Sequence, residues 1–194
     1  MLSDDGLDLL FRQARSHNAW KDEPVSETLL RAVYDLTRMG PTSANCSPAR
    51  FVFLASKEAK ERLVPHLFEG NINKVRTAPV CVIIAYDTQF YEKVPELFPH
   101  RPQMKEYFSG NPAFAQDTAF RNSSLQGAYF MLGARALGLD CGPMSGFKND
   151  GVDTEFFPDG RWKSNFICSI GHGDPAGLFP RSPRLSFEDA CKVL

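Results

Sequence analysis

Long apolar runs, paired cysteine motifs and an excess of either charge are all missing from this sequence of 194 residues. No segment approaches about 18 consecutive apolar residues, so we expect no membrane-spanning helix. Lys and Arg number 22 against 23 Asp and Glu, which gives a net charge of −1. This balance provides no electrostatic reason to expect nucleic acid or a membrane surface as a partner.

Cysteine and histidine are scarce and follow no metal-binding pattern. The five cysteines are widely spaced, and no C-x-x-C motif occurs. Cys81 and Cys168 lie inside apolar runs, where we expect inert core residues. The four histidines share no ligand spacing, so no metal site is expected. Acidic residues interrupt the N-terminal stretch, and we therefore expect no secretory signal and a reducing, cytoplasmic location.

The sequence does contain enough apolar material for one packed core. Hydrophobic residues make up 43% of the chain and aromatic residues 12%, which fits a single domain spanning residues 1–194. Apolar periodicity and end signals predict helices at residues 3–14, 26–40, 57–64, 71–77, 116–137 and from 186 onward. Apolar runs predict strands at residues 50–55, 80–86 and 165–170. Few strands separated by many helices indicate the α+β class.

Two of the expected helices carry informative patterns. In the helix at residues 26–40, the expected buried side consists of Leu29, Leu30, Val33, Tyr34 and Leu36. The helix at residues 116–137 is rich in small residues, which permit close approach by another helix: Gly127, Ala128, Gly133, Ala134 and Ala136.

Residues 87–116 form a segment of unusual composition. They hold four prolines together with several Phe and Tyr, so the segment is too aromatic for a disordered linker and too long for a simple connection. It is either an excursion packed on the core or a lid over a site. By residue type alone, His100, Tyr91 and Tyr107 could supply a proton to a reacting group.

The loop within residues 40–53 joins a predicted helix to a predicted strand. Pro41 and Pro48 bracket six small or polar residues, which offer hydroxyls, an amide and backbone N–H groups but no core. Such a loop is either a ligand site held by rigid elements or an ordinary connection.

No side-chain constellation for catalysis is evident. Ser145 does not lie in the G-x-S-x-G motif of hydrolases. Residues 171–176 imitate a dinucleotide fingerprint, but Pro175 disrupts the required turn and no helix pattern follows directly. A bound cofactor that carries the difficult chemistry would explain this absence, in which case no residue is expected to be catalytic itself.

Five short stretches, in this order, resemble the nitroreductase family of flavin enzymes. They are residues 15–20 (RSHNAW), the loop at 40–53, residues 71–74 (NINK), residues 142–147 (GPMSGF) and residues 181–184 (RSPR). Within the family, the chain looks most like the branch that contains the malonic semialdehyde reductase of uracil breakdown. The resemblance extends from about residue 7 to residue 194. It implies a nitroreductase-like sandwich, with a small, mostly antiparallel central sheet surrounded by helices, and a homodimer with flavin sites at the subunit interface.

The resemblance also implies a set of residues that bind flavin mononucleotide (FMN). Arg15 and Ser16 match the motif that contacts the phosphate and ribityl chain, and Asn18 stands where many relatives have Arg or Lys. Arg181 and Arg184 match the basic pair that clamps the phosphate, and arginine forks suit a phosphate dianion. The loop that lies along the flavin in relatives corresponds here to Pro41, Thr42, Ser43 and Asn45.

Two further matches concern the flavin ring. Asn71 and Lys74 correspond to contacts at the ring edge, where a cation would stabilise negative charge on N1 and O2 of reduced flavin. The segment that passes the reactive N5 edge in relatives corresponds to Pro143, Met144, Ser145 and Gly146. Some relatives have Glu where Ser145 stands, so a backbone role is what carries over.

The function implied by the resemblance is that of an NAD(P)H oxidoreductase. NADH or NADPH reduces the flavin and leaves, and a small acceptor then takes its place: malonic semialdehyde or a similar carbonyl compound, a nitroaromatic or a quinone. Two alternatives stay open, a flavin-binding protein without turnover and a thiol-based redox protein that uses Cys46. The residues beside Cys46 are uncharged, so nothing in the sequence lowers its pKa.

Overall fold

A four-stranded antiparallel sheet forms the centre of the computed structural model, which describes all residues 1–194. Its strands are β1 (Ala49–Leu54), β2 (Val80–Asp87), β3 (Asp140–Met144) and β4 (Trp162–Gly171). They lie in the order β1-β2-β4-β3, so β2 and β4 are central. Every residue of β2 is buried, as its continuous apolar sequence predicts.

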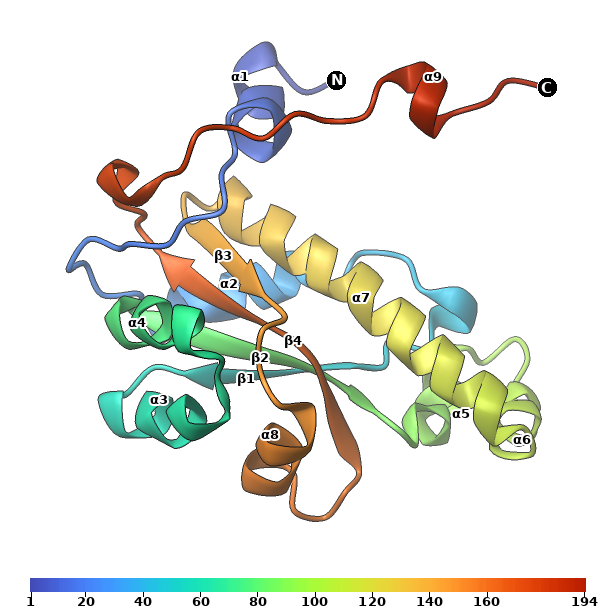
Figure 1. The fold of residues 1–194 in the computed structure, drawn as a ribbon. Coiled ribbons are helices and arrows are strands. Elements are labelled where there is room, and N and C mark those ends of the chain that lie inside the picture. The colour runs from blue at the N-terminus through green and yellow to red at the C-terminus, as the bar shows by residue number, and fades with distance from the viewer.

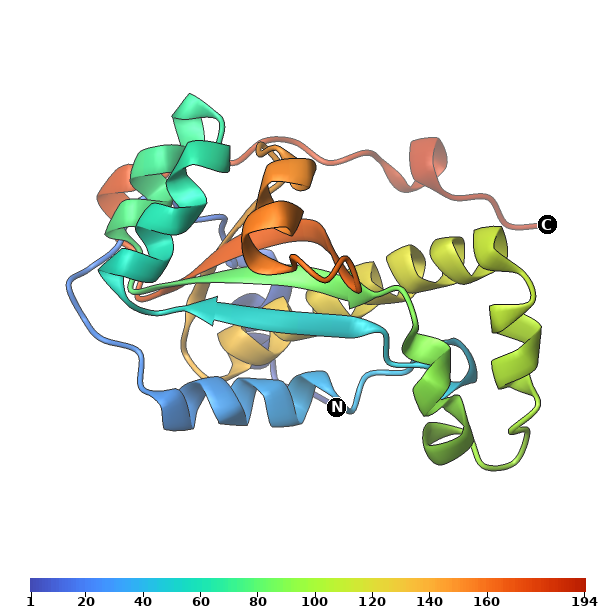
Figure 2. The ribbon, with the colours of Figure 1, turned by 90° about the horizontal axis from the view of Figure 1, so that it is seen from below.

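Helices cover both faces of this sheet (Figures 1 and 2). On one face lie α2 (Glu27–Thr37) and α7 (Pro112–Ala136), which bury Val33 and Phe130 against the sheet. On the other lie α3 (Lys57–Leu63), α4 (Glu69–Thr77) and α8 (Asn149–Phe156), whose core includes Leu63, Val75 and Val152. The predicted α+β class, with a small antiparallel sheet surrounded by helices, is therefore confirmed.

Short elements complete the chain. At the N-terminus a single turn, α1 (Asp4–Leu7), continues into a π-helix, η1 (Asp8–Arg12). The others are η2 (Ser43–Asn45), η3 (Val64–His66), η4 (Phe90–Lys93), α5 (Val94–Leu97), α6 (Met104–Ser109), η5 (Pro175–Gly177) and α9 (Phe187–Ala190). None of the helices has both the length and the apolar character that a membrane span requires.

Several sequence expectations need correction. The strand β3 and the helix α8 were not predicted. In α2 the buried residues are Leu30, Val33 and Thr37, whereas Tyr34 and Leu36 are exposed, so the expected buried side was too wide. The N-terminal helix buries none of its residues.

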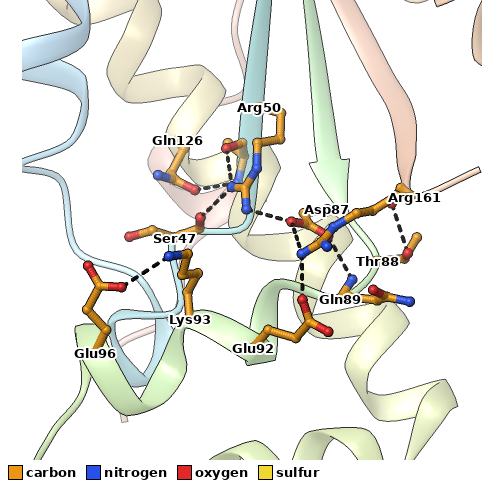
Figure 3. A network of polar contacts seen from close by, with 11 residues as sticks. Ser47, Arg50, Asp87, Thr88, Gln89, Glu92, Lys93, Glu96, Gln126 and Arg161 are labelled. Atoms are coloured by element: carbon orange, nitrogen blue, oxygen red, sulfur yellow. Dashed lines mark hydrogen bonds and ion pairs between the residues drawn. The ribbon is translucent and has the colours of Figure 1, made fainter. Parts of the chain in front are cut away.

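The segment at residues 87–116 is packed on the end of the sheet. The side chains of Phe90, Val94 and Phe108 form a buried cluster with the start of α7. At its root, buried Asp87 accepts hydrogen bonds from Arg50 at 2.7 Å and from Arg161 at 3.0 Å (Figure 3). Of the two alternatives, the packed excursion is the one that these contacts support.

The small residues of α7 serve packing within the chain. A Cβ atom at Gly127 would lie 2.4 Å from the Phe166 ring, and one at Gly133 would lie 3.4 Å from the Leu36 side chain on α2. The predicted close approach of a helix is thus observed between α7 and α2.

Candidate functional site

Six of the predicted site residues line one cavity of about 770 Å³. Its walls come from the N-terminal segment, α4, the last turn of α7 and the C-terminal tail, segments far apart in sequence (Figure 1). The predicted residues that line it are Arg15, Ser16, Asn18, Lys74, Arg181 and Arg184.

The cavity is strongly basic. Arg15 donates to the Phe179 carbonyl and Arg181 to the Ala14 carbonyl at 2.9 Å, and neither forms an ion pair. The Arg184 guanidinium bonds only to carbonyls of its own segment, and the Lys74 ammonium makes no hydrogen bond or ion pair. Cations without carboxylate partners around one cavity create a positive potential that favours an anionic ligand.

Two further arginines line the cavity and were missed in the sequence. Arg12 forms ion pairs with Asp4 at 2.7 Å and Asp8 at 2.6 Å, so its charge is already neutralised. Arg135, in the last turn of α7, donates to the Leu10 carbonyl at 3.2 Å and has no carboxylate partner. A basic residue in the last turn of a helix is common, so only its tertiary position identifies Arg135.

The N-terminal and C-terminal walls of the cavity are joined through their backbones. The His17 N–H donates to the Cys141 carbonyl of β3 at 3.0 Å, which places residues 16–18 along the free edge of the sheet. The Asp174 N–H then donates to the Ala19 carbonyl at 2.9 Å. Two irregular segments are therefore held side by side next to β3.

A second group of predicted residues lies where β3 leads into α8. The Asn71 side chain donates to the Gly146 carbonyl at 3.0 Å, and Lys74 follows one turn later on α4. A Cβ atom at Gly146 would lie 2.6 Å from the Asn71 amide, so this contact requires glycine. Asn71 thus fixes the segment formed by Pro143, Met144, Ser145 and Gly146.

The third group, Pro41 to Asn45, lies apart from the cavity. In Figures 1 and 2 this loop sits beside α5, at the end of the sheet away from α4. The Asn45 side chain donates to the Leu97 carbonyl at 2.7 Å, and the Ser43 N–H donates to Asn122 at 2.8 Å. Ala44, Asn45 and Ser47 all adopt positive φ angles. Strained backbone of this kind is typical of functional loops. Within one chain, however, none of the residues Pro41 to Asn45 lines the basic cavity.

The side chains of Thr42 and Cys46 stabilise the loop from within. The Ser47 N–H donates to the Thr42 hydroxyl at 3.1 Å, and Cys46 is buried. Burial raises the pKa of the Cys46 thiol to about 12, so a thiolate is disfavoured at neutral pH. These observations oppose the thiol-based alternative.

The structure thus belongs to the class of antiparallel α+β sandwiches, and its cation-lined cavity beside the sheet edge favours an anionic ligand. The sequence profile of the Nitroreductase family matches residues 11–172. The chain belongs to that family, as the ordered motifs predicted.

Individual relatives agree over nearly the whole chain. A protein of Rhodopseudomonas palustris (strain TIE-1), provisionally named NADH dehydrogenase/NAD(P)H nitroreductase, is 58% identical over 193 residues, covering 100% of this chain and 98% of the relative. The provisionally named nitroreductase ydfN of Bacillus subtilis has a similar fold, with a TM-score of 0.89 at 22% identity, covering 99% of this chain and 100% of that one. One from Exiguobacterium sibiricum 255-15, solved in complex with FMN, has a TM-score of 0.86 at 21% identity, covering 100% and 99%.

Proposed function

We propose that this protein is an FMN-dependent NAD(P)H oxidoreductase. The observation that carries the proposal is the cavity lined by Arg15, Lys74, Arg135, Arg181 and Arg184, none of which has a carboxylate partner. A phosphate monoester carries about −1.5 to −2 charges at neutral pH and accepts several charge-assisted hydrogen bonds, so it suits this cavity. The names of the full-length relatives and the FMN complex of a protein with the same fold support the same assignment.

The residues divide the work of holding FMN by position. Arg15, Arg181 and Arg184 would neutralise the phosphate, and Ser16 and Asn18 would offer polar groups to the ribityl chain. The bound flavin would supply the hydride chemistry, which no side chain here can perform.

The ring end of the site would be held by α4 and the end of β3. Lys74 would place a positive charge near the pyrimidine edge of the ring, where charge develops on reduction. Asn71 would keep the backbone of residues 143–146 against the ring by its bond to Gly146.

The complete site would require a second copy of the chain. The loop Pro41–Asn45 lies away from the cavity, so its predicted contact with flavin needs the loop of a partner. Exposed apolar side chains along α7, Phe120 and Leu125, and in the tail, Phe179, Leu185 and Phe187, offer surface for such a dimer.

For the acceptor we propose a small carbonyl compound, with malonic semialdehyde as the leading example. Support comes from the resemblance to the semialdehyde-reductase branch and from the aromatic segment 87–116, which packs beside the loop Pro41–Asn45 through the bond from Asn45 to Leu97. Tyr107 and His100 on this segment are exposed and remain candidate proton donors. General nitro or quinone reduction is the second candidate, and the relatives' names favour it.

Steady-state kinetics separate the two candidates. The flavin-loaded protein would be assayed with NADH and NADPH against malonic semialdehyde, a nitroaromatic and a quinone. We expect the aldehyde to give the highest kcat/KM. Turnover of the nitroaromatic and the quinone with none of the aldehyde would contradict the carbonyl proposal and leave the second candidate.

A further inference from the structure

The two irregular walls of the basic cavity meet at one carboxylate, that of Asp140 at the start of β3. One of its oxygens, Oδ1, lies 3.3 Å from Nε2 of His17 in the N-terminal wall. The other, Oδ2, accepts the backbone N–H of Gly173 at 2.9 Å, and Gly173 leads into the C-terminal wall. A single side chain therefore contacts both walls.

The His17 side chain is enclosed at this point. It is 7% exposed, whereas the side chain of Asp140 is 41% exposed. The other ring nitrogen, Nδ1, is buried without a hydrogen-bond partner, so the contact with Asp140 is the one polar contact of the ring. A Cβ atom at Gly173 would lie 2.0 Å from Nδ1, so the ring occupies space that only glycine leaves open.

The direction of the His17 side chain sets the direction of its neighbours. Residues 16–18 run along the edge of β3, and side chains of an extended segment alternate between its two sides. With His17 turned inward against Gly173, Ser16 and Asn18 point the other way, and both line the cavity. On the C-terminal wall, Gly177 follows Gly173 by one short turn, and its carbonyl accepts from Asn18 at 3.5 Å.

We propose that His17, Asp140 and Gly173 form a latch that fixes the register of the two walls and so positions the groups that hold the flavin phosphate. The three are positioning residues, because they act on Arg15, Ser16 and Arg181 through the backbone. The inference rests on the proposed function, since it takes the phosphate of FMN as the ligand of this cavity.

Comparison of FMN with riboflavin tests the latch, because the two differ only in the phosphate. Each flavin would be titrated into the apoprotein of the parent and of His17→Ala, Asp140→Ala and Gly173→Ala, with flavin fluorescence as the readout. We expect FMN affinity to fall about 10-fold or more in each variant and riboflavin affinity to fall less, because riboflavin can lose only the ribityl contacts of Ser16 and Asn18 and has no phosphate contacts to lose. The double variant His17→Ala/Asp140→Ala should lose no more FMN affinity than Asp140→Ala alone, since Asp140→Ala already removes the contact with His17 together with the bond from Gly173.

Matched variants distinguish the possible failures. Asp140→Asn keeps an acceptor for the Gly173 N–H, so its FMN affinity should fall less than that of Asp140→Ala. His172→Ala, at a half-exposed histidine on the same wall that lies 3.8 Å from Glu23, should bind both flavins as the parent does. Circular dichroism of each apoprotein checks that it folds.

Arg181→Ala tests the cavity assignment separately. If Arg181→Ala loses the preference for FMN while His17→Ala and Asp140→Ala keep it, the latch is wrong and the cavity assignment stands. If the latch variants lose both flavins equally, they act on the fold in general and the latch is also wrong. If Arg181→Ala keeps the preference as well, the proposed phosphate site itself fails.

Discussion

At the scale of single residues, the site depends on cations held by backbone carbonyls. Arg15 and Arg181 each bond to a carbonyl of the opposite wall, which orients the guanidinium group but leaves its charge uncompensated. Arg12, which lines the same cavity, is neutralised by two aspartates. The sequence motifs identified Arg15 and Arg181, because basic residues at these places in the family motifs are expected to contact the phosphate. Arg135 belongs to no motif, and its position depends on how α7 packs.

The first prediction concerns Arg184, whose side chain contacts only its own segment. Arg184→Ala should weaken FMN binding about 10- to 100-fold, because one charge-assisted hydrogen bond contributes roughly 1.5–3 kcal/mol. The melting temperature of the apoprotein should not change, since Arg184 is exposed. Arg31→Ala, which breaks an exposed pair with Glu27 on α2, is the matched control and should leave FMN affinity unaltered. Equal FMN affinity in Arg184→Ala and the parent would remove Arg184 from the site.

The second prediction concerns the buried thiols. Burial raises the pKa of Cys46 to about 12, against about 8.5 for a cysteine in an unfolded chain. The Cys46 thiol therefore keeps its proton in the folded state at pH values where it has lost it in the unfolded state. The contribution of the neutral thiol to the free energy of unfolding is complete below about pH 8.5 and is lost as the pH rises toward 12.

Urea unfolding of the apoprotein between pH 8 and 10.5 checks this expectation. Replacing Cys46 by Ala should reduce the decline in unfolding free energy by up to about 1.4 kcal/mol per pH unit above pH 9. Cys191 is exposed and serves as the control, so Cys191→Ala should keep the parent slope. An unchanged slope in Cys46→Ala would show that the thiol ionises as easily in the folded protein as in the unfolded chain.

At the scale of secondary structure, the elements that the sequence revealed are those with a clear apolar pattern. The run at residues 80–86 predicts β2 because both faces of a central strand are buried. The edge strand β3 was missed because Gly142 and Pro143 disfavour strands, although an edge tolerates proline. The helix α8 was missed because residues 149–151, Asn-Asp-Gly, are typical of a turn. There Gly151 packs so closely on His66 that a Cβ atom would lie 2.3 Å from its ring, a tertiary contact that local propensity does not reveal.

The third prediction concerns the root of the 87–116 segment. Asp87 is 2% exposed and lies between Arg50 and Arg161, whereas both arginines are partly exposed (Figure 3). Asp87→Asn removes the only carboxylate partner of Arg50, whereas Arg161 keeps its ion pair with Glu92 at 2.8 Å. We expect a loss of about 2–4 kcal/mol in unfolding free energy, below the largest values for buried pairs because the arginines can rehydrate. Asp35→Asn, in an exposed pair with Arg38, should cost less than about 0.5 kcal/mol. Similar unfolding curves for the two variants would show that this network does not anchor the segment.

At the scale of the whole molecule, one chain holds two separated parts of the predicted site. The segments that line the basic cavity and the loop Pro41–Asn45 lie in different regions of the fold, with the loop beside α5 at the end of the sheet away from α4 (Figures 1 and 2). No property of a single sequence gives the distance between them, so the sequence motifs alone could not show that the parts lie in separate regions. The separation follows from the fold, and it is the structural reason for proposing that each site is shared between two copies.

The fourth prediction tests that sharing by complementation. One variant would carry Arg15→Ala and Arg181→Ala, and the other would carry Ser43→Trp, a bulky block at an exposed loop position. Each variant alone should bind almost no FMN. After unfolding and refolding together, about a quarter of the sites should bind FMN, because half the dimers are mixed and each mixed dimer has one intact site. No recovery on mixing, with dimers present by sedimentation, would contradict a shared site.

The most direct test of the central claim is anaerobic titration of the purified protein, supplemented with FMN, with NADH or NADPH. We predict one bound FMN per chain, and bleaching of the flavin absorbance near 450 nm by one equivalent of reductant, in keeping with two-electron hydride transfer. Adding an acceptor should restore the colour. A folded protein that binds no FMN at micromolar concentration, or a bound FMN that neither NADH nor NADPH can bleach, would contradict the account.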